Sequence, residues 1–185
     1  MIIKNSLKNV KFVNRVEYLQ KICTGKKVLH LGATASPETK EAIAKGYFLH
    51  FDLDRVSEHL IGLDLDTSMI EWLSNNHGIN NIKQGNIEKI EDYPQEDFDI
   101  IVAGEIFEHL SNTGKALDCI HSIMGRSGNL VITVPNAYSI KGLLRALMKY
   151  EFIHPDHTLH HSPHTLKALL GRHGFDVVDY FSYVN

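Results

Sequence analysis

The sequence predicts an α/β fold in which a mostly parallel sheet of about six strands carries helices on both faces. Two observations lead to this expectation. Short runs rich in Val, Ile and Leu alternate with segments whose apolar residues recur at helical spacing, a pattern typical of βαβ units. The strand runs are also apolar throughout rather than alternating with polar residues, as in strands that are buried on both faces.

The chain is expected to be one domain, because 185 residues fit a single hydrophobic core. Residues 1–25 are predicted to form a helical appendage, since Phe12, Val16 and Leu19 recur near helical spacing. Residues 26–185 form the core. Its six predicted strands are 27–31, 59–64, 81–84, 98–103, 128–134 and 175–184, and the last of these is expected to be antiparallel or at the edge of the sheet.

Helices are predicted between these strands from capping signals and apolar spacing. The first is expected to open with Ser36 as N-cap and Pro37 as the first helical residue, and to stop near Gly46. The others are predicted at 67–77, 113–124, 140–149 and 164–173.

Composition narrows the classes of function. A hydrophobic fraction of 43% and a charged fraction of 22% are those of a globular chain. No run approaches the roughly 18 apolar residues of a membrane span, the N-terminus lacks a secretory signal, and two cysteines suit a reducing compartment. A cytoplasmic protein is therefore expected. Its net charge of −3 argues against long nucleic acid as the partner.

Parallel sheets bind ligands beyond the carboxyl ends of their strands, so the candidate site residues follow the predicted strands. Gly32 follows the first strand in a turn where backbone N–H groups can approach a ligand; an ordinary βα turn is the alternative. Asp64 ends the second strand and can accept both hydroxyls of a ribose, whereas helix capping would explain Asp66 alone. Asn86 can pair with a purine edge or simply form a turn.

The segments VLHLGATAS, LIGLDLDTSMIEWL, NIKQGNIEKI, FDIIVAGEIFEHL and GNLVITVPNAYS, in this order, resemble the successive motifs of class I S-adenosylmethionine-dependent methyltransferases. The tail HPDHTLHHSPHTLKALLGRHGF is similar to that of a small bacterial group associated with glycan modification. The resemblance covers residues 27–180. It implies a Rossmann-like fold, here with the seventh strand missing or very short, and S-adenosyl-L-methionine as cofactor.

The resemblance also implies which residues bind that cofactor: Gly32, Ala33, Thr34, Asp64, Leu65, Asn86, Ile87, Gly104 and Glu105. The residues after the first predicted strand would hold the methionine part of the cofactor. The residues after the second would bind its ribose and adenine, and the residues after the third would contact the edge of the adenine. Those after the fourth would line the sulfonium and the acceptor mouth. The first motif departs from the family, because His30 replaces the usual acid and Thr34 and Ser36 replace glycines.

The resemblance implies O-methylation of a small hydroxyl acceptor such as a glycan or a nucleotide-sugar. A hydroxyl nucleophile must lose its proton, and His109 is the first candidate base, with His157 second. The alternative role for His109 is a helix cap.

A metal is a second way to activate the hydroxyl. Residues Glu105, Glu108 and His109 resemble the Glu-x-x-Glu-His element of methyltransferases that act on the 2′-hydroxyl of small-RNA ends and on catechols, where it holds a divalent metal. The resemblance implies a site for Mg²⁺, Mn²⁺ or Zn²⁺ with His157 as the fourth ligand, and an acceptor with vicinal hydroxyls.

Two other classes of function stay open. The altered glycine loop is compatible with a catalytically inactive S-adenosylmethionine-binding or regulatory module, because fold does not guarantee activity. A nicotinamide-dependent oxidoreductase is disfavoured, because the loop after the first strand lacks the G-x-G-x-x-G pattern. Nothing in the sequence indicates an oligomeric state.

Overall fold

The computed structural model describes residues 11–94, 96–125, 127–137, 139–151 and 154–184. Its strands are β1 (Phe12–Asn14), β2 (Lys27–Leu31), β3 (His59–Asp64), β4 (Ile82–Gln84), β5 (Ile100–Gly104), β6 (Asn129–Thr133) and β7 (Ser182–Val184). Its α-helices are α1 (Arg15–Cys23), α2 (Thr39–Lys45), α3 (Leu49–Asp54), α4 (Thr67–His77), α5 (Thr113–Ile123), α6 (Ile140–Leu147) and α7 (Pro163–Arg172). The short 3₁₀ turns η1 (Ile90–Asp92) and η2 (Phe107–His109) follow β4 and β5.

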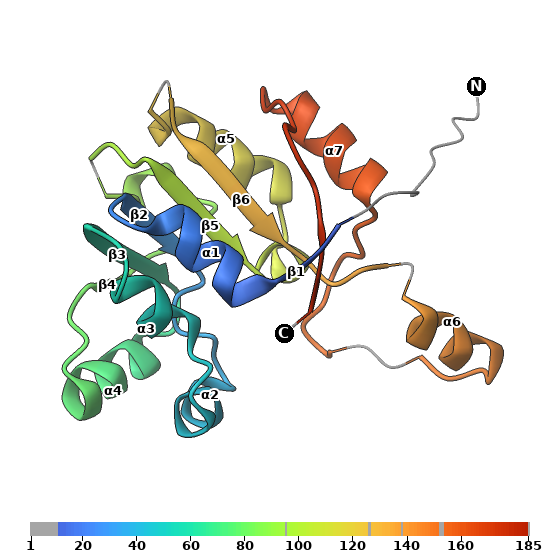
Figure 1. Cartoon of the computed structure of the whole chain (residues 1–185), viewed down its shortest axis with the longest axis horizontal. Helices are drawn as coiled ribbons and strands as arrows, with labels where there is room; N and C mark the ends of the chain where they lie inside the picture. Colours follow the sequence, from blue (N-terminus) through green and yellow to red (C-terminus); the bar gives the residue numbers. More distant parts are fainter. Residues whose placement is uncertain (1–10, 95, 126, 138, 152–153, 185) are drawn as a thin grey trace.

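Five strands form one sheet in the order β4-β3-β2-β5-β6, and all neighbours pair in parallel. Their carboxyl ends therefore lie along one edge of the sheet (Figure 1), where open α/β sheets bind ligands. The predicted α/β, Rossmann-like architecture is confirmed.

Helices cover both faces because successive strand residues point to opposite sides. Val28 of β2 joins a buried cluster with Leu19 of α1 and Leu53 of α3, whereas the next residue, Leu29, joins one with Leu117 of α5. The segment expected to be an appendage thus contributes a buried helix face to the core. The first part of that prediction, residues 1–10, lies outside the described residues.

The end of the chain differs from the prediction. The last strand, β7, has three residues and pairs in parallel with β1, so that Tyr183 lies opposite Val13 in a separate two-stranded sheet. It is therefore neither antiparallel nor an edge of the main sheet, which has five strands in the described part of the chain rather than six. The residues of β1 carry no strand signal of their own, because they pair only with a segment at the far end of the sequence.

Two helices also differ from the prediction. Helix α2 begins at Thr39 with Glu38 as its N-cap residue, because the Ser36 hydroxyl donates to Asp66 Oδ2 instead of capping this helix (2.6 Å). Helix α3 is not among the helices that the sequence predicted. Its His50 and Leu53 are fully buried, so it covers the sheet beside α1.

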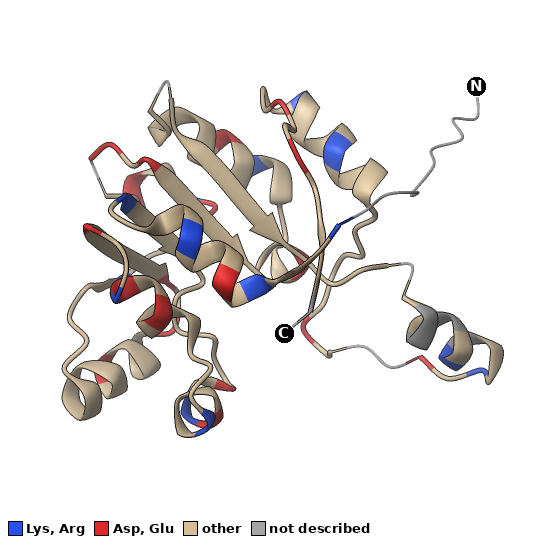
Figure 2. Cartoon of the chain, in the orientation of Figure 1, with Lys and Arg blue, Asp and Glu red and all other residues tan. Residues whose placement is uncertain are grey.

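Charge is spread over the described chain. Basic and acidic residues alternate along α1, for example (Figure 2), in keeping with a net charge of −3. None of the described helices is long and apolar enough to cross a membrane.

Candidate functional site

A cavity of about 230 Å³ opens at the carboxyl ends of β2, β3, β4 and β5. Its lining comprises Gly32, Leu63, Asp64, Leu65, Gly85, Asn86, Ile87, Glu88, Ile106, His109, Leu110 and Ser111. Five of the predicted cofactor residues are in this lining: Gly32, Asp64, Leu65, Asn86 and Ile87. The candidate base His109 borders the same cavity, so the structure brings together residues from four separate strand ends.

The other four predicted cofactor residues lie outside the lining. Ala33 and Thr34 are fully buried, Gly104 lies against Arg15 of α1, and Glu105 is hydrogen-bonded to Tyr183 of β7. Several lining residues were not predicted, because they carry no motif by which a sequence could single them out: Leu63, Gly85, Glu88, Ile106, Leu110 and Ser111.

Gly32 is in the left-handed region, with φ +70°, and a Cβ there would lie 3.0 Å from Ile106 Cδ1. Both facts favour glycine, since other residues are strained at positive φ. The lack of a side chain therefore lets the turn lie close to Ile106, in the segment that follows β5.

The Asp64 carboxylate, at the wall of the cavity, accepts hydrogen bonds from the loop after β2 and from the loop after β3. Its Oδ2 accepts from the Thr34 N–H at 2.9 Å, and its Oδ1 accepts from the Asp66 N–H at 3.0 Å. A carboxylate offers about four lone-pair sites, so both oxygens keep capacity for ligand hydroxyls. Asp66 is the N-cap of α4 and accepts from the Met69 N–H, which confirms capping as its role.

Asn86 is a turn residue, as the alternative interpretation held. Its Oδ1 accepts from the Glu88 N–H at 2.8 Å, and its own N–H donates to Asp92 Oδ2 at 2.8 Å. Its contact with an adenine edge stays a prediction. Nearby, Leu65 is 61% exposed although it is apolar, and Ile87 is buried, so the cavity has an apolar wall beside its carboxylate.

A neutral histidine pair occupies the place of the usual first-motif acid. His30 Nδ1 lies 3.2 Å from His50 Nδ1, and His50 Nε2 lies 3.1 Å from Asn81 Oδ1. Asn81 donates its amide hydrogens to Asp54 and to the Leu60 carbonyl. His50 Nε2–H must therefore donate to Asn81, and His30 Nδ1–H to His50. Burial lowers the pKa of both imidazoles, that of His30 strongly.

Glu105 is held away from the cavity by the end of the chain. It has a φ of 54°, and its Oε1 accepts from the Tyr183 hydroxyl at 2.5 Å. The Arg15 guanidinium lies 5.8 Å from the Tyr183 ring centre and donates to Thr133 Oγ1. A Cβ on Gly104 would lie 2.5 Å from Arg15 Nη2, so a larger residue at this position would displace the guanidinium group.

The Glu108 side chain is buried, with 1% of its surface exposed. Its Oε2 has no hydrogen-bond partner among the described residues. Burial, reinforced by the Glu105 charge, raises the pKa of Glu108 to about 7. It belongs to the protein interior rather than to an open ligand site.

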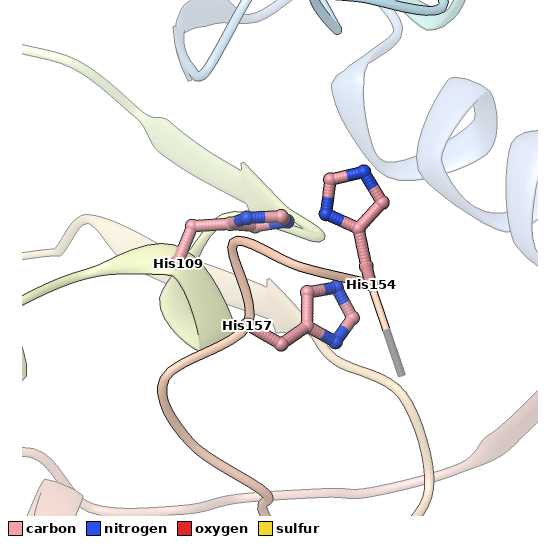
Figure 3. A group of neighbouring side chains, drawn as sticks. All are labelled: His109, His154 and His157. Atoms are coloured by element: carbon pink, nitrogen blue, oxygen red, sulfur yellow. The ribbon is translucent and has the colours of Figure 1, made fainter. Parts of the chain in front are cut away.

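Three histidines form a group at the edge of the cavity (Figure 3). His109 ends η2, while His154 and His157 come from the loop before α7. Each offers a nitrogen within 4.8 Å of the others. The rings of His109 and His157 are perpendicular, with centres 4.6 Å apart. His109 does not cap α5, because Asn112 is its N-cap, so that alternative is wrong.

The predicted metal ligands are therefore only partly brought together. His109 and His157 meet, but Glu105 is bonded to Tyr183 and Glu108 is buried. Among the described residues, the group with metal-ligand spacing contains His154 in place of both carboxylates. Six histidines follow residue 150, and their spacing in the sequence does not indicate that His154 is the one that lies beside His109 and His157.

Comparison with known proteins shows that this chain shares its fold with solved methyltransferase structures. A family model described as "Methyltransferase domain" matches residues 17–180. The YcgJ protein of Bacillus subtilis is 19% identical with a TM-score of 0.62, over 85% of this chain and 66% of that one. A SAM-dependent methyltransferase from Archaeoglobus fulgidus is 23% identical with a TM-score of 0.58, over 86% of this chain and 65% of that one.

The small RNA methyltransferase HEN1 is also similar, at 19% identity and a TM-score of 0.58, over 86% of this chain but 21% of that one. The chain thus spans slightly less than two thirds of the first two structures. No curated protein matches the sequence.

Proposed function

The chain belongs to the methyltransferase-domain family, and from that premise we propose that it transfers a methyl group from S-adenosyl-L-methionine to a hydroxyl of a small acceptor. The observation that carries the proposal is the Asp64 carboxylate at the wall of a cavity built from strand ends. An acid at this position of a doubly wound sheet suits the two hydroxyls of a ribose.

The remaining lining fits the other parts of this cofactor. The turn at Gly32 offers backbone beneath the methionine part, and Leu65 and Ile87 offer apolar surface for the adenine. The exposed Leu65 side chain would lose its contact with water on binding, which stabilises the complex. In this proposal Ala33, Thr34, Gly104 and Glu105 support the site without lining it.

S-adenosylmethionine supplies a methyl group on a sulfonium when it is bound. His109 borders the cavity and is half-buried, so in this proposal it orients the acceptor hydroxyl and takes its proton, with His157 as the second candidate. Partial burial and the neighbouring His109 and His154 lower the pKa of His157, which favours the neutral imidazole that a base requires.

The acceptor we propose is a glycan or nucleotide-sugar hydroxyl. Its support is the similarity of the tail, residues 154–175, to glycan-modifying methyltransferases, together with the net charge of −3, which disfavours long nucleic acid. A cytoplasmic place for the protein stays a prediction.

The test is calorimetry of S-adenosylmethionine binding to Asp64→Ala. We expect the free energy of cofactor binding to become less favourable by about 1.5–3 kcal/mol, since hydrogen bonds from the ribose hydroxyls to a charged acceptor are lost. Asp99→Ala is the matched control, because Asp99 accepts from the Lys27 N–H at the opposite end of β2. Unchanged affinity in Asp64→Ala would remove this residue from the site.

Two further outcomes concern the whole proposal. Tight cofactor binding without methyl transfer to any hydroxyl acceptor would favour the inactive binding module. Binding of a reduced nicotinamide in place of S-adenosylmethionine would favour the oxidoreductase.

A further inference from the structure

We propose that His109, His154 and His157 form a binding site for one divalent transition-metal ion, of which Zn²⁺ is the best fit, with a fourth position open to an acceptor oxygen. The site itself stands on the histidine geometry. Its role toward an acceptor rests on the proposed methyltransferase function.

The first support is the placement of the nitrogens. The three imidazoles offer atoms that all lie within 4.8 Å of one another, and the rings point toward a common space (Figure 3). Tetrahedral zinc with Zn–N bonds near 2.0–2.1 Å needs its ligand nitrogens roughly 3.4 Å apart. All three rings are partly exposed, which leaves room for the side-chain rotations that would close that difference.

The second support is the frame that carries the histidines. The Thr158 N–H donates to the Glu108 carbonyl at 2.8 Å, and the Thr158 hydroxyl lies 2.9 Å from the Leu110 carbonyl. The His157 N–H donates to the His154 carbonyl at 3.0 Å. The loop is thus fastened to η2 on both sides of His109, and a site held on a fixed frame loses little entropy on binding.

The third support lies behind the His154 ring. Glu38 Oε1 is 3.8 Å from its Nε2, and Asp156 Oδ2 is 3.9 Å from its Nδ1. The Asp156 N–H donates to the same Nδ1 at 3.3 Å, so a neutral His154 carries its hydrogen on Nε2, toward Glu38, and a metal at Nδ1 would take the place of that N–H. This carboxylate–histidine–metal arrangement is typical of metal sites, because it orients the ring and raises its basicity.

The donor set indicates the kind of metal. Imidazole suits Zn²⁺ and the neighbouring transition metals, whereas Mg²⁺ prefers oxygen ligands and is disfavoured here. Ligation needs neutral rings, because a protonated imidazole nitrogen has no lone pair for the metal. Three protein ligands leave one position of a tetrahedron open, as in catalytic zinc sites.

The open position of the metal would lie next to the cavity proposed for the cofactor, because His109 also lines that cavity. An oxygen bound there would lie beside the space proposed for the methyl donor. The fitting acceptor is therefore a molecule with two neighbouring oxygens, such as a vicinal diol of a sugar. A nitrogen that binds a metal cannot also take a proton, so metal binding replaces the base role of His109 and His157.

The test is titration of the metal-free full chain with Co²⁺, read by its visible absorption, followed by displacement with Zn²⁺. We expect one equivalent of four-coordinate Co²⁺. Each of His109→Ala, His154→Ala and His157→Ala should weaken binding more than about 100-fold, since loss of an outer partner alone costs about 10–100-fold. His160→Ala, an exposed histidine of the same loop, is the control and should bind normally.

Circular dichroism checks that each variant is folded, and Glu38→Gln gives a milder test with an expected loss of about 10-fold or more. Wild-type protein that binds no Co²⁺, or His154→Ala that binds it as tightly as His160→Ala, overturns the proposal. Addition of a catechol, as a probe with neighbouring oxygens, should change the cobalt spectrum; an unchanged spectrum contradicts the open position.

S-adenosylmethionine calorimetry on the same samples separates the two proposals. Cofactor binding without cobalt binding refutes the metal site alone. Cobalt binding without cofactor binding refutes the methyltransferase and leaves the metal site in place.

Discussion

Glu108 is a carboxyl group that the fold keeps from water. Its pKa is raised from 4.5 to about 7, so between these values the unfolded chain releases a proton that the folded chain retains. Folding stability is therefore lost as the pH rises through this range, by about 3 kcal/mol in total, since each pKa unit corresponds to about 1.4 kcal/mol.

We predict that Glu108→Gln unfolds at higher urea concentration than the wild type at pH 8, and that this advantage shrinks toward pH 5. The reason is that glutamine has no charge to bury. Urea denaturation at both pH values measures the difference, with Glu151→Gln, an exposed residue, as control. An advantage that is the same at pH 5 and pH 8 would contradict the raised pKa.

The His30–His50 pair has the opposite pH dependence. Its pKa values are lowered by burial, so the unfolded chain takes up protons below about pH 6.5 while the folded chain does not. Stability is then lost as the pH falls below that value. We predict that His30→Asn, which keeps a hydrogen-bond donor for His50 but cannot titrate, loses less stability than the wild type between pH 6.5 and 5.

Denaturation curves across this range measure the slope. Parallel curves for His30→Asn and the wild type would show that His30 does not titrate with folding. Because Glu108 acts in the opposite direction over part of the range, each variant must be compared with the wild type at each pH.

Among the elements, β7 is joined to the segment after β5 through the hydroxyl of Tyr183. Tyr183 donates to Glu105, and hydrogen bonds to charged groups contribute about 1.5–3 kcal/mol. We predict that Tyr183→Phe lowers the free energy of unfolding by about 1–2 kcal/mol, measured by urea denaturation. Tyr180→Phe is the control, because Tyr180 is 48% exposed. Equal stability of the two variants would mean that the Tyr183–Glu105 bond contributes nothing.

The elements also show what the sequence could predict. The bounds of β2 and β3 agree with the sequence prediction, because continuous apolar runs and the Asp66 cap are local signals. Strand β1 is not local, since its three residues pair only with β7.

The same distinction applies to the candidate site. Gly32 and Asp64 could be found at strand ends, whereas Thr34 is buried and turned out to act through its backbone on Asp64. His154 could not be chosen from its neighbours, because only the folded loop brings it beside His109.

At the scale of the whole molecule, a ligand that binds only the folded state stabilises all of it. We predict that S-adenosylmethionine at 100 times its dissociation constant raises the free energy of unfolding by about 2.7 kcal/mol, seen as a higher melting temperature. At the same concentration Asp64→Ala should gain less. Melting temperatures that do not respond to the cofactor would contradict the proposed binding site.

The central strand also determines the order in which this molecule can assemble. Val28 of β2 lies opposite Leu60 on one side and Ile100 on the other, so β2 is completed only after much of the later chain has arrived. Such distant pairings slow folding, because a long loop must close before each contact forms. The cavity draws on residues from Gly32 to Ser111. A nascent chain therefore contains the turn at Gly32, which we propose to bind the cofactor, well before the rest of the cavity can form around it.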